Sequence, residues 1–303
     1  MQIKEHFRSH LLSLQNTICT ALEQCDGKAK FKEDIWERPG GGGGKTRVMA
    51  NGNVFEKAGV NFSQVDGVVT PAMKTQLQLS GHYFYATGVS LVLHPSNPFV
   101  PTVHANYRYF ELYNQHHQVV DAWFGGGADL TPYYLWEEDA RHFHGVLKNT
   151  CDEFDSSFYP LFKKECDRYF VNKHRNNECR GIGGIFFDHL RGDEIRSIDF
   201  YRLFTQTVAE AFLPAYLPIV HKRQLLSFTK DNKYWQEIRR GRYTEFNLVH
   251  DRGTLFGLKT NGRTESILMS LPPTVRFDYA YEPAAGSPEY ELQKICEMPR
   301  DWV

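Results

Sequence analysis

The chain has 303 residues, of which 41% are hydrophobic and 23% charged, and its 35 Lys and Arg are balanced by 36 Asp and Glu. This composition is typical of a globular protein with a large core, and the charge balance argues against nucleic acid or an anionic membrane as the main partner. The six cysteines form no C-x-x-C pair, so we expect no structural zinc site and reduced thiols in an intracellular protein.

Residues 1–24 predict an amphipathic first helix. Acidic and basic side chains interrupt the segment, so we do not expect a signal peptide, and Glu5 and Glu23 count against a transit peptide. No apolar run approaches membrane-spanning length. We therefore expect a cytoplasmic protein without a transmembrane segment. The apolar residues at helical spacing are Ile3, Phe7, Leu11, Leu14, Ile18 and Leu22.

The glycine run RPGGGGGKTRVM, residues 38–49, is one residue away from a phosphate loop, G-x-x-x-x-G-K-[ST], because Pro39 replaces the first glycine. A phosphate loop follows a buried strand and opens a helix. The upstream FKEDIWER is charged, and downstream the sequence NGN at 51–53 predicts a tight turn between two extended pieces. These flanks disfavour a nucleotide site and leave two alternatives, a flexible surface loop or a mobile lid whose backbone amides meet an anionic ligand.

The rest of the chain alternates between strand clusters and helix pairs. Strict βαβ alternation is absent, which favours an α+β fold with a mostly antiparallel sheet covered by helices, as one domain over residues 1–303. We expect strands at 82–94, 101–114, 118–125, 181–190, 243–250, 254–260 and 266–271. We expect helices at 137–154, 157–176 and 197–213, the last with Ser197 as its N-cap.

Segment 101–114 carries an unusual polar row. In a strand, successive side chains point to opposite faces, so His104, Asn106 and Arg108 share one face. The row is roughly 13 Å long at about 3.3 Å per residue and could span one large ligand. The alternative is that this face is simply exposed to solvent. The opposite face would carry Val103, Ala105, Tyr107 and Tyr109.

Two further segments could carry chemistry. In WFGGGADLTP, three glycines precede Asp129, and glycines let a bulky ligand approach the backbone. The alternative for Asp129 is a turn or helix N-cap position. The second segment is Asp251-Arg252-Gly253, for which an exposed turn is the alternative. No H-E-x-x-H or other tight metal pattern and no G-x-S-x-G elbow occurs.

Six stretches in one order resemble a known family, oxygen-dependent coproporphyrinogen III oxidase. They are GGGGKTRVMANGNVFEKAGVNFS, GVSLVLHPSNPFVPTVHANYRYFE, WFGGGADLTPYYLWEEDARHFH, KHRNNECRGIGGIFFDHL, YTEFNLVHDRGTLFGLKTNGRTESILMSLPP and PRDWV. The resemblance covers nearly the whole chain and implies a large, flat antiparallel sheet with helices on both faces, assembled as a homodimer. It implies conversion of coproporphyrinogen III to protoporphyrinogen IX, in which two propionates become vinyls with loss of CO2 and reduction of O2 to H2O2. It implies no organic cofactor.

The same resemblance assigns roles to individual residues. His104 matches the family's proposed proton donor, and Asp129, Asp251 and Arg252 match polar residues of the active cleft. Substrate-contacting positions are matched by Ser90, Asn106, Tyr107, Arg108, Asn261, Gly262 and Arg263. Histidines described as metal ligands in bacterial members are matched by His94, His104, His144 and His174. Eukaryotic members are described as metal-free, and we expect no metal here.

The chemistry of a tetracarboxylate substrate makes these roles sensible. Arginine holds a carboxylate through two parallel hydrogen bonds, so Arg108, Arg252 and Arg263 are candidates for the propionates. The interpretation of Asp129 is that it accepts hydrogen bonds from pyrrole N–H groups and helps one of them to lose its proton. On this interpretation the glycine run is a mobile loop near the pocket, in which we expect Lys45 and Arg47 to contact propionates.

Two other classes of protein remain open. A tetrapyrrole-binding protein without turnover would keep the arginines and aromatic residues and would not need Asp129. A phosphate-loop NTPase would bind ATP through Lys45.

Overall fold

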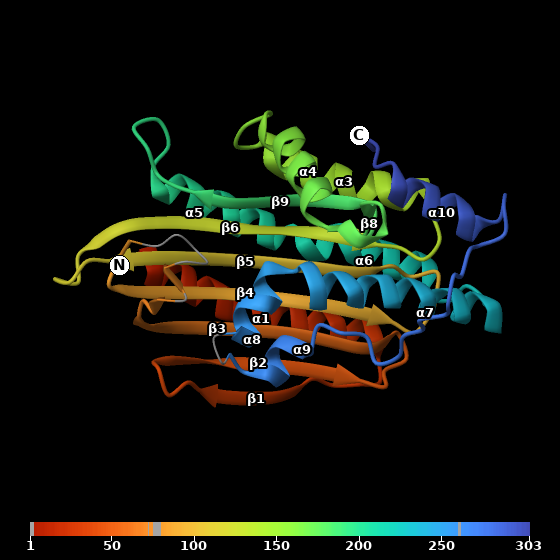
Figure 1. Ribbon diagram of the computed structural model, residues 1–303, viewed down its shortest axis with the longest axis horizontal. Coiled ribbons are helices and arrows are strands. Elements are labelled where there is room, and N and C mark those ends of the chain that lie inside the picture. The colour runs from red at the N-terminus through yellow and green to blue at the C-terminus, as the bar shows by residue number, and fades with distance from the viewer. Residues whose placement is uncertain (1–2, 72, 75–79, 260–261) are drawn as a thin grey trace.

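The computed structural model describes residues 3–71, 73–74, 80–259 and 262–303, and a seven-stranded antiparallel sheet forms its centre (Figure 1). The strand order is β1-β2-β3-β4-β5-β6-β9, so each strand pairs with its neighbour in sequence until β9 returns to β6. The expected antiparallel sheet is therefore confirmed. The strands are β1 (Lys32–Glu37), β2 (Gly42–Ala50), β3 (Phe55–Val68), β4 (Tyr83–Pro95), β5 (Thr102–Tyr113), β6 (Val119–Thr131) and β9 (Gly183–Leu190). A separate two-stranded sheet joins β7 (Val171–Asn172) to β8 (Glu178–Cys179).

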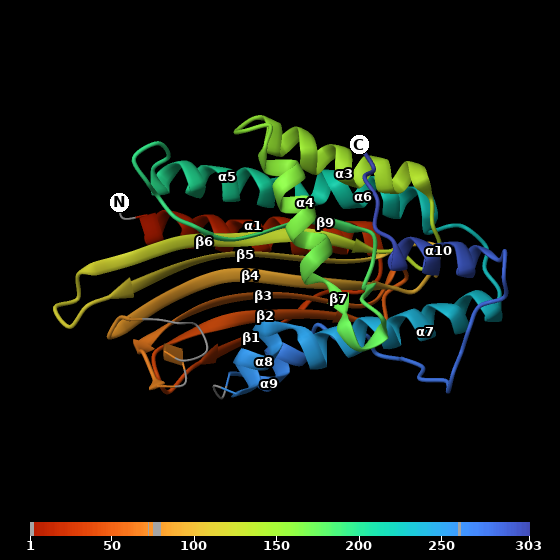
Figure 2. The same cartoon turned by 45° about the horizontal axis from the view of Figure 1, so that its top comes forward.

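Helices cover both faces of the sheet (Figure 2). One face carries α1 (Ile3–Asp26), α5 (Ile198–Glu210) and α6 (Phe212–Arg223), with α3 (Glu137–Asp152) outside them. The other face carries α7 (Lys230–Glu245), the π-helix η2 (Phe246–His250), α8 (Arg252–Lys259) and α9 (Thr264–Leu268). The remaining helices are α4 (Phe158–Tyr169), which packs on β9, the 3-10 turn η1 (Lys173–Arg175) and α10 (Pro288–Glu297). The α+β architecture with helices on both faces is thus confirmed.

The main core lies between the sheet and the α1/α5/α6 layer. Strand β5 buries every second side chain there, and Tyr107 is 0% exposed. Phe7 of α1 meets the rings of Tyr109 and Phe124 at centroid distances of 6.3 and 5.0 Å. The alternation predicted for 101–114 is confirmed, because the apolar set of β5 faces this core and the polar set faces α7–α9.

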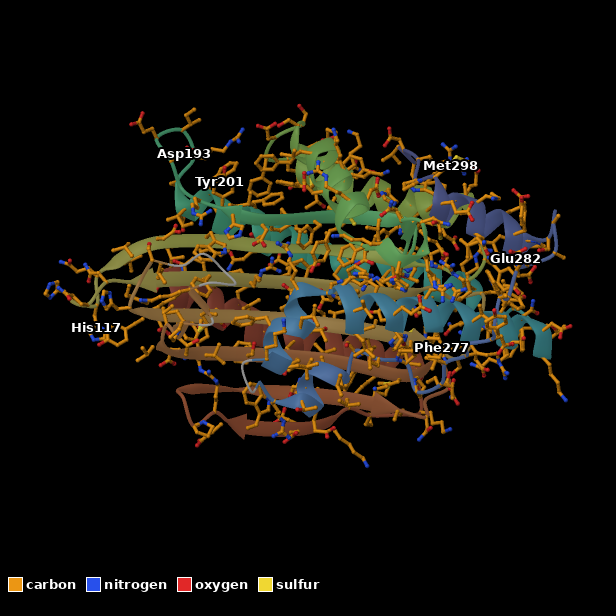
Figure 3. The ribbon with its side chains drawn as sticks, in the orientation of Figure 1. His117, Asp193, Tyr201, Phe277, Glu282 and Met298 are labelled. Carbon is orange, nitrogen blue, oxygen red and sulfur yellow. The ribbon has the colours of Figure 1, made fainter. Side chains whose placement is uncertain are left out.

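Several local predictions are also confirmed. The Ser197 side chain caps α5 by accepting a hydrogen bond from the Phe200 N–H. The NGN turn joins β2 to β3, with Asn51 at a φ of 57°. The β5–β6 hairpin turns at 114–118, and His117 lies at its tip (Figure 3).

Three predicted strands near the C-terminus are wrong, because helices occupy these segments. Segment 243–250 is the end of α7 followed by η2, segment 254–260 overlaps α8 up to Lys259, and segment 266–271 overlaps α9. The physical reason lies upstream, where a Thr229–Asn232 capping box starts α7. Trp235, Ile238 and Tyr243 of α7 are then buried, with Trp235 and Ile238 one helical turn apart, and this packing overrides the strand preference of segment 243–250.

The helix predicted for 157–176 also ends early, at Tyr169, because Val171–Asn172 pairs with β8. The stretch Ile198–Arg223, which contains α5 and α6, is long and apolar enough by composition to cross a membrane, and half of its apolar window is buried in the fold. The expectation that no run approaches this length is therefore corrected. The burial of Phe204, Val208 and Phe212 in the core accounts for the apolar composition.

The glycine run is a β-hairpin, which corrects the loop expected over residues 38–49. Only the turn 38–41 lies between β1 and β2, and the Arg38 N–H donates to Gly42 O at 2.9 Å. Gly44 is inside β2, where a Cβ would lie 2.3 Å from the ring of Trp36. These glycines give Trp36 room to cross the neighbouring strand. No helix follows Lys45, so the phosphate-loop hypothesis lacks its helix N-terminus.

Candidate active site

A polar row crosses the sheet on the face that carries α7–α9. The strand registers align Asp34, Thr46, Asn61, Ser90 and Asn106 on β1 to β5. The first and last of these strands lie roughly 19 Å apart at about 4.8 Å per strand. Ser90 and Asn106, two predicted substrate-contacting residues, are therefore direct cross-strand neighbours. The row is long enough to accept a large flat ligand.

His104 and Asp129 form the centre of the site. They are cross-strand partners on β5 and β6, and His104 Nδ1–H donates to Asp129 Oδ1 at 2.8 Å. The His104 side chain is 21% exposed. The alternative that this face of segment 101–114 is simply exposed to solvent is therefore wrong at His104. Asp129 is 2% exposed and lies inside β6, so it is neither a turn residue nor a helix N-cap.

A buried arginine completes this pair. Arg180, just after β8, donates through Nη2 to both carboxylate oxygens of Asp129, at 2.9 and 2.7 Å, and through Nη1 to Asn247 Oδ1 at 2.8 Å. Its guanidinium carbon lies 4.3 Å from the Phe170 ring centroid and 4.5 Å from that of Tyr243. Sequence reasoning missed Arg180, and the only local signal was a charged residue directly before an apolar strand.

The charges explain the state of Asp129. Burial alone would raise the pKa of its carboxyl, but Arg180 and His104 outweigh burial and hold the pKa below its ordinary value. Asp129 is therefore a weak proton acceptor, and both of its oxygens already have partners. This geometry argues against the pyrrole-deprotonating role expected for Asp129. It favours a carboxylate that fixes the tautomer and orientation of His104.

A second cluster lies beside the first. Arg108 donates through Nη1 to Asn106 Oδ1 at 2.9 Å, and its Nη2 lies 3.0 Å from Asp188 Oδ2. Arg252 Nη2 lies 4.0 Å from the same Asp188 oxygen, and its side chain is 64% exposed. The structure therefore brings together the predicted Asn106, Arg108 and Arg252 around an acidic residue that was not predicted as part of the site.

Asp251 supports the start of α8. It accepts a hydrogen bond from the Tyr169 hydroxyl at 2.9 Å and one from the Thr254 N–H at 2.7 Å. The Tyr169 hydroxyl in turn accepts from the Arg252 N–H at 3.1 Å, and the Arg252 guanidinium carbon lies 4.8 Å from the Tyr169 ring centroid. Asp251-Arg252 is thus an ordered helix start and not a free turn.

The third predicted segment lies at the β1 end of the row. Arg263 donates to Asp34, and α9 is anchored by a 2.7 Å hydrogen bond between Ser266 Oγ and Thr46 Oγ1. The Gly262 N–H donates to Gly257 O at 2.8 Å. Asn261, predicted as a substrate contact, lies outside the described residues.

Two expectations about side-chain placement are wrong. Tyr107 lies on the core face of β5 and is 0% exposed, because strand alternation turns it away from His104 and Arg108. Lys45 and Arg47 point to the α1 face, where both lie near Glu33, at 3.7 and 2.8 Å. Their side chains therefore lie on the opposite face of the sheet from the polar row.

The four histidines considered as metal ligands do not converge. His94 is fully buried, donating through Nε2 to Ser270 O at 2.8 Å and accepting from Thr102 at 3.2 Å. His144 is a buried residue of α3 and donates to Ile182 O at 3.1 Å. His174 is exposed, 2.7 Å from His250 and 2.9 Å from Glu245. Among the described residues, no three His, Cys, Asp or Glu side chains are placed to share a metal ion.

The side chains on this face suit a class of protein that binds a flat polycarboxylate and moves protons on it. Its half-buried histidine–carboxylate pair suits proton transfer, and its arginines suit carboxylates.

Comparison with known proteins gives the family. The sequence profile described as Coproporphyrinogen III oxidase matches residues 6–302. Two plant proteins are similar over 99% of this chain and 80% of their own length. Coproporphyrinogen-III oxidase 1, chloroplastic, of Arabidopsis thaliana is 50% identical over 312 aligned positions. Oxygen-dependent coproporphyrinogen-III oxidase, chloroplastic, of Glycine max is 50% identical over 315. The chain belongs to the coproporphyrinogen III oxidase family.

Proposed function

We propose that this chain catalyses the oxygen-dependent oxidative decarboxylation of coproporphyrinogen III to protoporphyrinogen IX in haem and porphyrin biosynthesis. Family membership and the name of the Glycine max relative support the reaction. In each of two steps, one propionate loses CO2 and a β-carbon hydrogen to become a vinyl, and the two electrons released reduce one O2 to H2O2. The observation that carries the proposal is the His104–Asp129 pair beside two carboxylate-binding arginines on one half-buried face.

The arginines bind and orient the substrate. Arg108 and Arg252 share one acidic partner at the β9 end of the row, and Arg263 lies at the β1 end. Carboxylates of a flat tetracarboxylate could therefore be held at opposite ends of the sheet. Ser90 and Asn106 lie between these ends and offer neutral hydrogen bonds to the macrocycle.

His104 is the proton-transfer residue in this proposal. Asp129 takes its Nδ1–H, so Nε2 is the nitrogen that a ligand would meet. Arg180 keeps Asp129 charged and in place, which makes Asp129 and Arg180 positioning residues. Asp251 has a positioning role too, because it orders the backbone from which Arg252 projects.

The test is aerobic turnover of coproporphyrinogen III by the purified protein. Protoporphyrin fluorescence after oxidation reports product, and an oxygen-free sample and a sample with chelator are run in parallel. We expect oxygen-dependent product that survives the chelator. Tight porphyrin binding without product would favour the tetrapyrrole-binding protein, and loss of product with chelator alone would contradict the proposed absence of a metal.

We propose O2 as the co-substrate, no organic cofactor and a homodimer. Light scattering during size-exclusion chromatography tests the dimer, and a monomer mass would contradict it. The cytoplasmic location stays a prediction, and both plant relatives are named as chloroplastic. Cell fractionation tests it, and recovery in an organelle would contradict it.

A further inference from the structure

Asp188 occupies the place where two predicted substrate-binding arginines meet. Its Oδ2 lies 3.0 Å from Arg108 Nη2 and 4.0 Å from Arg252 Nη2, and its Oδ1 accepts the His189 N–H at 2.9 Å. The side chain is 21% exposed. Burial alone would raise the pKa of Asp188, but Arg108 and His189 together outweigh burial and hold the pKa below its ordinary value, so the group is an anion at neutral pH.

The backbone is shaped around this contact. Arg108 and Asp188 approach each other across Gly125 of β6, the residue paired with Arg108. A Cβ at Gly125 would lie 2.8 Å from Asp188 Oδ1 and 2.9 Å from Arg108 Nε, which is closer than real Cβ atoms come to such neighbours. The ion pair therefore depends on the missing side chain of Gly125, on the strand between β5 and β9.

Two of the five N–H donors of Arg108 have partners within the protein. Nη1 donates to Asn106, and Nη2 faces the Asp188 carboxylate. A ligand carboxylate needs two neighbouring N–H groups to bind the guanidinium through both of its oxygens. A ligand carboxylate that approaches Arg108 from the side of Asp188 therefore competes for Nη2 with the Asp188 carboxylate, which is the same chemical group as a propionate.

We propose that Asp188 is an exchangeable internal carboxylate, which holds Arg108 and Arg252 in the free protein and yields them to one carboxylate of the substrate. This inference rests on the proposed function, because it takes the ligand to be a porphyrinogen with four propionates. A ligand with a carboxylate at this place must displace Asp188, whereas a ligand without one leaves the Asp188–Arg108 contact in place. Asp188 therefore lowers the affinity for ligands that bring a carboxylate here.

A second arginine on this face has the same arrangement. Arg263 pairs with Asp34 of β1 at the other end of the polar row. Both ends therefore offer an arginine that is already charge-compensated by the protein. A tetracarboxylate could exchange at both ends.

The test measures binding of two porphyrins by fluorescence quenching, coproporphyrin III with four carboxylates and protoporphyrin IX with two. We expect Asp188→Asn to lower the Kd for coproporphyrin III about three- to ten-fold, as when one competing charged hydrogen bond is removed. The Kd for protoporphyrin IX should change less than about two-fold. In turnover, KM for coproporphyrinogen III should fall with Kd while kcat changes less.

The matched control is Asp121→Asn, which removes a carboxylate from the exposed Asp121–Arg191 pair beside the same strands, at 2.8 Å. It should leave both Kd values unchanged. Asp188→Glu should restore wild-type affinity, and Asp188→Ser repeats the test if Asp188→Asn folds poorly.

A raised Kd for coproporphyrin III in Asp188→Asn would overturn the proposal, because Asp188 would then only orient Arg108. Equal changes for the two porphyrins would overturn it as well. Absence of turnover by the unsubstituted protein would refute the proposed function. If that protein turns over normally and Asp188→Asn leaves the ratio of the two porphyrin Kd values unchanged, only the carboxylate exchange is refuted.

Discussion

Replacing Asp129 by Asn tests how the centre of the site is built. Arg180 is 2% exposed, and Asp129 is its only anionic partner within ion-pair distance among the described residues. In Asp129→Asn the amide oxygen can accept from Arg180, but the amide NH2 points a donor at another donor. Removing one member of a buried ion pair costs about 3–5 kcal/mol, because the other charge stays buried without compensation.

Two assays separate stability from turnover. Denaturant unfolding should show a loss of about 3–5 kcal/mol in unfolding free energy for Asp129→Asn. Turnover should show kcat reduced on the order of a hundred-fold, because His104 loses the partner that fixes its tautomer, with a much smaller change in KM. The control Asp121→Asn should lose less than about 1 kcal/mol, since both members of that pair are exposed.

The stability that the Asp129 carboxylate provides should depend on pH. A second substitution should restore part of the unfolding free energy that Asp129→Asn loses. The folded-state pKa of Asp129 lies below its usual value of 3.8, so its stabilisation is complete above about pH 4 and is lost as pH falls through the folded-state pKa. Adding Arg180→Met to Asp129→Asn should recover at least about half of the lost free energy without restoring turnover. An unfolding free energy for Asp129→Asn within about 0.5 kcal/mol of wild type would refute the buried-pair reasoning. A normal kcat would refute the positioning of His104.

Three further predictions follow from placement. Arg108→Ala should raise KM for coproporphyrinogen III more than about ten-fold and Lys45→Ala should not, because they lie on opposite faces of the sheet; equal effects in steady-state kinetics would contradict this. Tyr107→Phe should leave KM unchanged and stabilise the fold by up to about 1 kcal/mol, since its buried hydroxyl has no hydrogen-bond partner; a raised KM would return it to the site. Burial lowers the pKa of His144 to about 3, so the unfolding free energy should fall as pH drops from 6.5 towards 3. His144→Gln, which can still donate to Ile182 O, should make the unfolding free energy less dependent on pH in this range. An unchanged pH dependence in this variant would contradict the prediction.

Much of the fold followed from the sequence because its signals were local. Strand alternation placed His104, Asn106 and Arg108 on one face without any tertiary information. Ser197 indicated the start of its helix because a serine side chain can accept the N-cap hydrogen bond. The strand predictions at 243–250, 254–260 and 266–271 failed, since their residues pack as helices on a sheet formed by distant segments.

The sequence by itself determined the order of most elements and the residue types of the site, because periodicity and capping act over a few neighbouring residues. Tertiary structure alone decided which charges meet. Arg180 reaches Asp129 across 51 residues, and Asp188 reaches Arg108 across a glycine on the strand between them. The face on which Lys45 lies depends on how β2 is aligned with its neighbour, because a shift of one residue turns every side chain to the opposite face. Such contacts are set by the pairing of distant strands, and no local pattern specifies them.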